Sequence, residues 1–197
     1  MCCILGYNGK HEEKTLKKLL LSCRLRGVHA FGVAYYEKGK LNCYKSLNYT
    51  DFENYILQNK LTRFIAHYRY STSGDYKNMK NNQPLIWNND CLAFNGVINQ
   101  GTKKEIEAQY DLKLPSDNDG YVLMKKLNDT EFLKSNITFA AITINKDVIK
   151  GIRNIKRPLY KYSDKNKSIF CSTKDILFRS GLTQNIERLK ANTFYEI

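Results

Sequence analysis

The amino-acid sequence predicts an α+β protein in which antiparallel sheets are covered by helices. Strand-like runs occur in pairs joined by short turns, which is typical of antiparallel hairpins. Segments with apolar residues at helical spacing lie between these pairs. The 197 residues, of which 42% are hydrophobic, are enough for one core. We therefore expect residues 1–197 to form a single domain, without a linker or an internal repeat.

The first half of the chain is expected to alternate strands with helices. The run CCILGY is apolar and has the length of a buried strand. Before Gly27, a helix stop signal, apolar residues recur at helical spacing: Leu16, Leu19, Leu20 and Cys23. The predicted elements are, in order, a strand at 2–7, a helix at 12–25, a hairpin at 30–47 that turns at 38–40, a helix that Asp51 caps and that ends near Asn59, and a strand at 63–71.

The second half begins with a polar loop at 71–89 that is rich in Ser, Gly and Asn. A strand at 91–98 follows, and an Asn-Gly pair is expected to break it because both residues weaken a strand interior. The remaining predicted elements are helices at 102–110 and 119–128, hairpins at 138–154 and 160–173, and one or two strands within 186–197.

The chain is strongly basic, with 32 Lys and Arg against 19 Asp and Glu and a formal charge of +13. Such a charge suits a solvated lysine surface, and it also suits attraction to nucleic acid or to an acidic partner protein. The basic residues are scattered, and neither an Arg-rich tract nor a nucleic-acid-binding signature accompanies them. The charge alone therefore leaves nucleic-acid binding open.

The six cysteines include no Cys-x-x-Cys pair and have no His-x-x-x-His nearby, so we expect no zinc and no other metal. No signal peptide is recognisable, and no apolar run approaches the ~20 residues of a membrane span. We therefore expect a cytoplasmic protein with free thiols, no membrane contact and no cofactor. Four cysteines in apolar or strand-like segments are interpreted as small core residues: Cys23, Cys43, Cys91 and Cys171.

Candidate chemistry begins at Cys2. Removal of Met1, which is ordinary when the second residue is small, would leave a thiol and a free α-amine on one residue. Their reference pKa values lie near ~8.5 and ~8, so the amine can take the thiol proton directly or through one water. The residue would then supply both nucleophile and base without a histidine.

The segment FNGVIN (94–99) has two interpretations. Its Asn-Gly pair could form a bulge or a hairpin turn. It could instead form an oxyanion hole, in which Asn95 offers a side-chain amide and Gly96 an unshielded backbone N–H. Two such donors are what acyl transfer requires.

Two charged residues could bind a substrate. Arg69 stands at a predicted strand end in HYRYSTSG (67–74), as a surface residue or as a guanidinium that binds a carboxylate in a bidentate pair. In PSDNDGYVL (115–123), Asp117 or Asp119 either caps the next helix or binds an ammonium group. A carboxylate site together with an ammonium site would fit an α-amino acid.

These segments follow one another in an order that resembles the class II glutamine amidotransferase domain, a member of the N-terminal nucleophile hydrolases. MCCIL resembles that family's Met-Cys-Gly-Ile start, and HYRYSTSG its His-x-Arg-(aromatic)-x-Thr-x-Gly loop. FNGVIN resembles its Asn-Gly-x-Ile-x-Asn element. Further short matches lie along most of the chain: RGVHAFG (26–32), NQPL (82–85), NDGYVL (118–123), KRPLY (156–160) and FCSTKDIL (170–177).

The resemblance implies a four-layer αββα sandwich of two antiparallel sheets and L-glutamine as the substrate. It implies that Cys2 is the nucleophile, that its own α-amine is the base, and that Asn95 and Gly96 form the oxyanion hole. The implied cycle is attack of the Cys2 sulfur on the side-chain amide, loss of ammonia, and hydrolysis of a glutamyl thioester to glutamate.

The resemblance also implies roles for residues around the substrate. Arg69 would bind its α-carboxylate and Asp119 its α-amine. Thr72 would support it through the loop, and Arg26 would lie behind the N-terminus. The sequence departs from the family pattern at five positions, which are Cys3 for Gly, His29 for Asp, Phe94 for His, Tyr121 for Glu and Ser73 for a frequent His.

Three functions remain open at this point. The first is a glutaminase that feeds ammonia to a separate synthase protein. The second is a stand-alone hydrolase of another γ-glutamyl amide, with the same amino-acid clamp and a larger leaving group. The third is a basic binding module without activity, which the presence of all residues that the resemblance assigns to chemistry disfavours.

Overall fold

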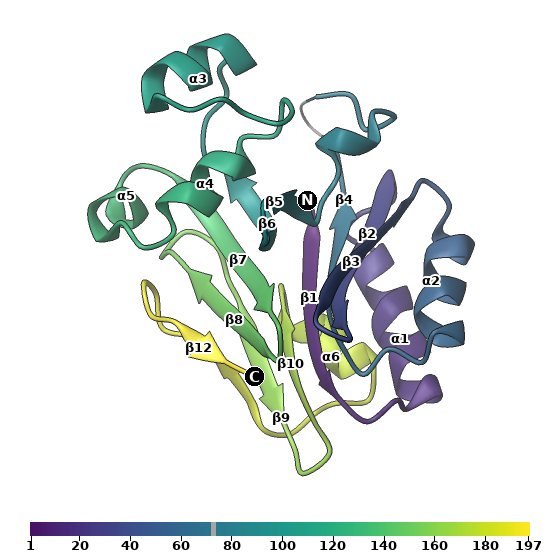
Figure 1. Ribbon diagram of the computed structural model, residues 1–197. Coiled ribbons are helices and arrows are strands. Elements are labelled where there is room, and N and C mark those ends of the chain that lie inside the picture. Colours follow the sequence, from purple (N-terminus) through teal and green to yellow (C-terminus); the bar gives the residue numbers. More distant parts are fainter. Residues whose placement is uncertain (72–73) are drawn as a thin grey trace.

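A computed structural model of the protein describes residues 1–71 and 74–197. Two antiparallel sheets lie face to face, and helices cover the outer face of each (Figure 1). The α+β class and the four layers expected from the resemblance are confirmed. Within the described residues, no helix is both long enough and apolar enough to cross a membrane.

The first sheet contains the N-terminal strand near its centre. Its strand order is β11-β9-β10-β1-β4-β2-β3. The strands are β1 (Cys3–Gly9), β2 (Ala30–Glu37), β3 (Lys40–Ser46), β4 (Arg63–Arg69), β9 (Tyr160–Ser163), β10 (Lys167–Cys171) and β11 (Ile186–Arg188). Strand β1 pairs with β4 on one side and with β10 on the other, so neighbours from distant parts of the chain fix its position.

The second sheet carries the segment FNGVIN. Its strand order is β12-β8-β7-β6-β5. The strands are β5 (Leu85–Trp87), β6 (Asp90–Val97), β7 (Thr138–Asn145), β8 (Val148–Arg153) and β12 (Tyr195–Glu196). Strand β6 lies between β5 and β7, and its pairing with β7 continues through Asn95 and Gly96.

The helices divide between the two outer faces. Helices α1 (Glu13–Arg24), α2 (Tyr49–Gln58) and α6 (Lys174–Arg179) pack on the first sheet. Helices α3 (Lys103–Tyr110), α4 (Gly120–Lys126) and α5 (Thr130–Lys134) pack on the second. A short 3₁₀ helix, η1 (Met79–Asn81), lies in the loop before β5.

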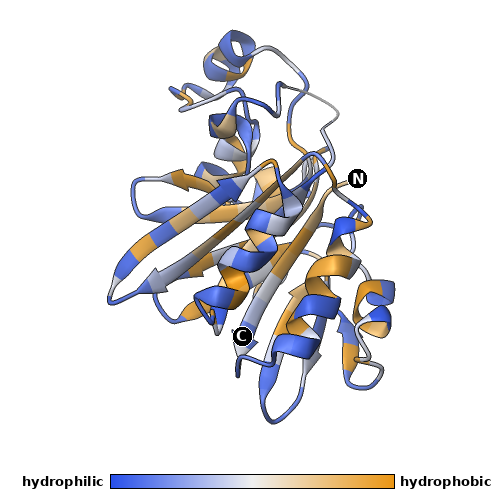
Figure 2. Ribbon diagram, turned by 90° about the vertical axis from the view of Figure 1, so that its right-hand side faces the viewer, coloured by the Kyte–Doolittle hydropathy of each residue, from blue (hydrophilic) through white to orange (hydrophobic). Residues whose placement is uncertain are grey.

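Alternation along the strands builds three apolar layers. In β1, Cys3, Leu5 and Tyr7 point to the outer helices, whereas Ile4 points between the sheets. Successive side chains of a strand face opposite sides, so one buried strand contributes to two layers. Figure 2 shows this composition, with hydrophobic residues along the strands and both hydrophobic and hydrophilic residues on the helices. The middle layer holds the two sheets together by burial of apolar surface.

Several predicted elements differ from the structure. Strand β6 is not broken at the Asn-Gly pair, because both residues take part in the ladder with β7. Helix α2 is capped by Asn48, whose side chain accepts hydrogen bonds from the amides of Thr50 and Asp51, and not by Asp51. Sequence periodicity did not predict strand β5 or helices α5 and α6. The strand has only a few residues and each helix only one or two turns, which is too short for a periodic pattern.

Candidate active site

The predicted site residues gather at one end of the sandwich. Figure 1 shows the N-terminus, the end of β4 and the end of β6 at this end, below helix α3. The antiparallel pairing of β1 with β4 brings the N-terminus and the end of β4 together. Cys3 lies opposite Tyr68, so the next residues outward are Cys2 and Arg69. The site is therefore built where strands of both sheets end.

The Cys2 side chain lies against the backbone that follows β4. Its sulfur accepts a hydrogen bond from the amide of Tyr70 at 3.4 Å and lies 3.7 Å from the Tyr70 carbonyl oxygen. Burial raises the pKa of the Cys2 thiol, while the Tyr70 backbone, the N-terminal charge and the Arg69 guanidinium act to lower it. The thiol is thus held in place next to two positive charges.

Met1 precedes this thiol and keeps the Cys2 nitrogen in a peptide bond. The Met1 side chain is 61% exposed. Its sulfur lies 3.3 Å from Nη1 of Arg157. Arg26, which follows helix α1, donates from Nε to the Cys2 carbonyl oxygen at 3.4 Å. Arg26 therefore contacts the backbone of Cys2.

Asn95 and Gly96 lie near the end of β6, in its ladder with β7. Asn95 is buried, and its Nδ2 has no hydrogen-bond partner among the described residues. A Cβ on Gly96 would lie 1.8 Å from the carbonyl oxygen of Thr138, so no other residue fits this backbone. The Asn-Gly pair is thus part of a continuous strand that carries an unused amide donor.

Arg69 is buried at the end of β4 and binds the loop that follows. Its Nη1 donates to Oδ1 of Asn82 at 2.6 Å and to the carbonyl oxygen of Asn81 at 3.0 Å. Its Nη2 donates to the carbonyl oxygen of Gly74 at 3.3 Å. Burial lowers the pKa of Arg69, and its charge helps to lower the pKa of Cys2. Thr72, the predicted loop contact, lies outside the described residues.

Asp119 holds the end of β6 and does not cap a helix. It occupies the N-cap position of α4 without a side-chain capping bond. Its Oδ2 accepts hydrogen bonds from the amides of Ile98 at 2.7 Å and Asn99 at 3.0 Å. Burial raises the pKa of the Asp119 carboxyl, and these amides act to lower it. Asp119 thereby ties the start of α4 to the strand that carries Asn95.

A cavity of about 650 Å³ opens beside these residues. Gly96 and Asp119 line it, as do Gly74, at the loop bound by Arg69, and the exposed Asp117. The residues between β6 and α3 form its opposite wall. Cys2, Arg69 and Asn95 are not among the residues that line it. The cavity wall carries the carboxylates of Asp117 and Asp119, so it suits a small polar ligand that has a cationic group.

Two features of the site were not predicted. Buried Asn81 connects the Arg69 loop to the start of α4, since its Oδ1 accepts from the amide of Asp117 at 3.1 Å and its carbonyl oxygen from Nδ2 of Asn118 at 2.8 Å. His29 stacks between Tyr70 and Tyr76 at centroid distances of 4.9 and 5.0 Å. Of these two residues, only His29 was noted in the sequence, as a departure from the pattern of the resembled family.

Comparison with solved structures identifies the same fold in other proteins. A glutamine phosphoribosylpyrophosphate amidotransferase from B. subtilis aligns with a TM-score of 0.75 at 18% identity, and an allosteric regulatory enzyme of purine biosynthesis with 0.76 at 19%. Both alignments cover 100% of this chain but 47% of the other, so the chain spans about half the length of those proteins. A glutamine aminotransferase class-II domain protein from Silicibacter pomeroyi aligns at 0.59 with 12% identity over 100% of this chain and 94% of its own.

No protein-family model and no curated protein matches the chain. At identities this low the likeness shows a common fold. The chain therefore has the fold of these glutamine amidotransferase structures, which is the sandwich of the N-terminal nucleophile hydrolases.

Proposed function

We propose, from this shared fold, that the chain is a cytoplasmic class II glutamine amidotransferase that hydrolyses the side-chain amide of L-glutamine to glutamate and ammonia. The observation that carries the proposal is Nδ2 of Asn95, a buried donor without a partner in the described structure. Leaving such a donor unsatisfied costs about 1–3 kcal/mol. A donor of this kind is useful where an acceptor arrives during the reaction, and an oxyanion is such an acceptor.

The proposed reaction starts once Met1 is removed. The α-amine of Cys2 takes the thiol proton, and the sulfur attacks the amide carbon of glutamine. The negative charge that develops on the oxygen is stabilised by Asn95 Nδ2 and the Gly96 N–H. The ammonium form of the Cys2 amine then returns the proton to the leaving nitrogen, and ammonia departs. Water attacks the thioester, which gives glutamate and restores the thiol.

Substrate binding is proposed to use two charged residues, Asp119 in the cavity wall and Arg69, which binds the loop beside it. Asp119 would bind the α-ammonium group, because its half-buried carboxylate lines the cavity. Arg69 would bind the α-carboxylate and Thr72 would support the substrate from the loop. Arg69 already holds Gly74 and Asn82, so binding would add a carboxylate to a guanidinium that the loop has oriented.

We further propose that the ammonia passes to a separate synthase protein. The formal charge of +13 suits an acidic surface on that partner, since complementary charge speeds association. Purified chain is then expected to hydrolyse glutamine slowly, and the partner to accelerate it.

A second candidate substrate is another γ-glutamyl amide. The cavity of about 650 Å³ falls in the range that holds drug-sized ligands and is larger than glutamine needs. A larger leaving group could occupy the part next to α3. Hydrolysis rates on a panel of γ-glutamyl amides distinguish the two candidate substrates. The second candidate is rejected if free glutamine is by far the best substrate.

Covalent labelling tests the proposed nucleophile. A glutamine-analogue electrophile should label Cys2, and peptide mass spectrometry should find the label on a chain that lacks Met1. Cys43 is the internal control, since its thiol is also half-buried but lies on β3. Label on Cys3 or Cys91, or full activity in protein that retains Met1, would contradict the mechanism.

A further inference from the structure

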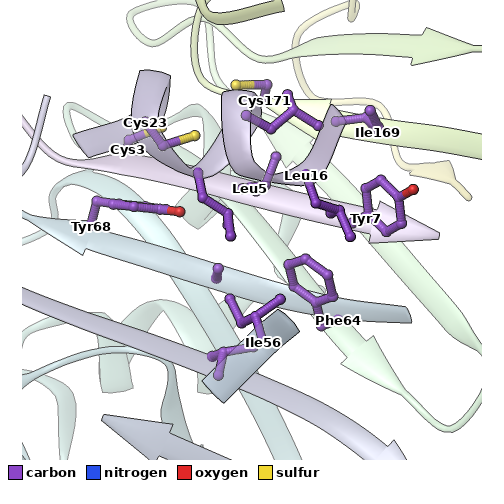
Figure 3. Packing of buried hydrophobic residues seen from close by; sticks show 14 of the residues in the cluster. Cys3, Leu5, Tyr7, Leu16, Cys23, Ile56, Phe64, Tyr68, Ile169 and Cys171 are labelled. Atoms are coloured by element: carbon purple, nitrogen blue, oxygen red, sulfur yellow. The ribbon is translucent and has the colours of Figure 1, made fainter. Parts of the chain in front are cut away.

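Three cysteines from distant parts of the sequence meet in the layer between the first sheet and its helices. Cys3 comes from β1, Cys23 from α1 and Cys171 from β10. Their sulfur atoms all lie within 4.8 Å of one another, and all three residues are fully buried. Figure 3 shows Cys3 and Cys23 side by side, with Cys171 at the neighbouring strand. Cys3 is also the residue that stands where the resembled family has glycine.

A backbone carbonyl group contacts this three-cysteine cluster. The Cys3 thiol donates a hydrogen bond to the carbonyl oxygen of Ile4 at 3.6 Å. The cluster thus consists of three closely spaced thiols within a buried layer.

A second, independent feature lies in the same layer. The Tyr68 hydroxyl is fully buried and has no hydrogen-bond partner among the described residues. Figure 3 shows Tyr68 in the same layer as Cys3 and Cys23. Burial raises the pKa of Tyr68. An orphaned hydroxyl in this layer indicates that a polar partner is missing there.

We propose that Cys3, Cys23 and Cys171 bind one Zn²⁺ ion that joins β1, α1 and β10. Three sulfurs around an ion at the usual Zn–S distance of about 2.3 Å lie roughly 3.8–4.0 Å apart. The three sulfur atoms are already within 4.8 Å of one another, so sub-ångström shifts bring them to that distance.

The net charge of the ion together with its three thiolates favours zinc over other thiophilic ions. Thiolates select Zn²⁺ and Cu⁺ among common ions. Three thiolates leave a net charge of −1 with Zn²⁺ and −2 with Cu⁺, and an apolar layer disfavours the larger charge. On binding, the ion replaces the thiol protons, which go to solvent, and no electron is transferred. This site was not predicted from the sequence, because the spacing of residues 3, 23 and 171 matches no zinc motif.

The site predicts slow exchange of the ion. All three ligands are fully buried, and α1 carries one of them over the sheet. The ion can therefore enter only while the chain folds or when α1 detaches. A chelator should remove zinc from the native protein slowly and from denatured protein at once.

The test is metal content after refolding of the full chain with Zn²⁺ under reducing conditions. Elemental analysis should find one zinc per wild-type chain, and Cys23→Ala should lose most of it. Cys91→Ala is the matched control, since Cys91 is equally buried but lies between the sheets, and it should retain the ion. Cys2→Ser should also retain it, because the nucleophile is not a ligand.

A second measurement separates lost binding from lost folding. Refolding with Co²⁺ should give thiolate-to-cobalt charge-transfer absorption in the wild type and in Cys91→Ala, and a weaker band in Cys3→Gly, the residue that the resembled family has there. The proposal is overturned if wild-type protein refolded in the presence of Zn²⁺ or Co²⁺ is folded but has bound no metal. It is also overturned if Cys23→Ala binds as much zinc as the wild type. Copper retained in place of zinc overturns the choice of ion, and a disulfide between two of the three cysteines overturns the site.

Discussion

Two buried asparagines differ in whether the fold satisfies their side-chain amide. Within the described structure, Nδ2 of Asn95 has no hydrogen-bond partner, whereas Nδ2 of Asn154 has one. Nδ2 of Asn154 donates to the Ile137 carbonyl oxygen at 2.7 Å, and its Oδ1 accepts from the Phe139 amide at 3.3 Å. Asn95 lies in β6 and Asn154 directly follows β8 of the same sheet. Only the amide nitrogen of Asn154 has a hydrogen-bond partner in the described structure.

The first prediction follows from this contrast. Asn95→Ala should lower the rate of glutamine hydrolysis by about 10²–10³, because one oxyanion donor is lost. It should leave the free energy of unfolding nearly unchanged, since no bond is broken. Asn154→Ala should destabilise by about 1–3 kcal/mol because it orphans buried backbone groups. Turnover and denaturant unfolding of both variants check this, and a large loss of stability in Asn95→Ala would argue for a structural role.

Asp119 supports a second prediction at this scale. Asp119→Asn keeps an oxygen that can accept from Ile98 and Asn99 but removes the charge. If the carboxylate binds an ammonium group, KM for glutamine should rise about 10- to 100-fold with little change in kcat. Asp117→Asn is the control, because Asp117 lines the same cavity but is exposed. Equal kinetics in the two variants would remove Asp119 from substrate binding.

The pH dependence of KM provides an independent check. Burial raises the pKa of Asp119, so the carboxylate is protonated at a higher pH than an exposed Asp. KM should therefore rise on acidification at a pH above the range in which an exposed Asp is protonated, and Asp119→Asn should not show that rise. An identical acid limb in the variant would assign it to another group.

Among the elements, β6 is constrained most at Gly96. The strand approaches β7 so closely that a Cβ would meet the Thr138 carbonyl oxygen at 1.8 Å. Gly96→Ala should therefore force the strands apart and destabilise by about 3 kcal/mol or more. Gly39→Ala tests the backbone strain of replacing a glycine in the absence of a clash. Gly39 has a φ of 77°, and a Cβ there would have nothing within 4 Å. This variant should lose only about 1 kcal/mol of stability. Thermal unfolding of both variants should show the larger loss for Gly96→Ala.

Hairpins and long helices were predictable from the sequence, whereas contacts between elements were not. The turn at Lys38 and Gly39 and the helical spacing of Leu16 and Leu19 are local signals, and they led to β2, β3 and α1. The contacts of Asp119 with the amides of Ile98 and Asn99 lie about twenty residues earlier in the chain. The sequence suggested a helix cap or an ammonium site at Asp119, and no local rule suggested these contacts. Cys23 was correctly predicted to be buried, but its two sulfur neighbours could not be foreseen because no local pattern joins them.

At the scale of the whole molecule, the space between the sheets sets the response to acid. His67 is fully buried, and burial together with the charges of Arg69 and Lys45 lowers its pKa to about 3 from 6.5. Below pH 6.5 the unfolded chain binds a proton that the folded chain does not, so stability is present above that pH and is lost as the pH falls.

The corresponding prediction concerns the stability of the full chain. Between pH 6.5 and 5 the wild type should lose about 2 kcal/mol relative to His67→Leu, which has no group to titrate there. Denaturant unfolding at several pH values measures the difference. Parallel pH profiles for wild type and variant would mean that His67 is protonated without cost in the folded protein.

The pairing of β1 has a consequence for the order of events during synthesis. Leu5 of β1 lies opposite Cys171 of β10. Strand β1, which follows the candidate nucleophile, can therefore form its hydrogen bonds with β10 only after nearly the whole chain has been synthesised. At ribosomal rates of about 5–20 residues per second, this delay is on the order of 10 s or more. During that time the emerging N-terminus is accessible to a peptidase, as the proposed removal of Met1 requires. Translation therefore provides an interval in which the terminus can be processed before β1 is enclosed by both of its neighbours.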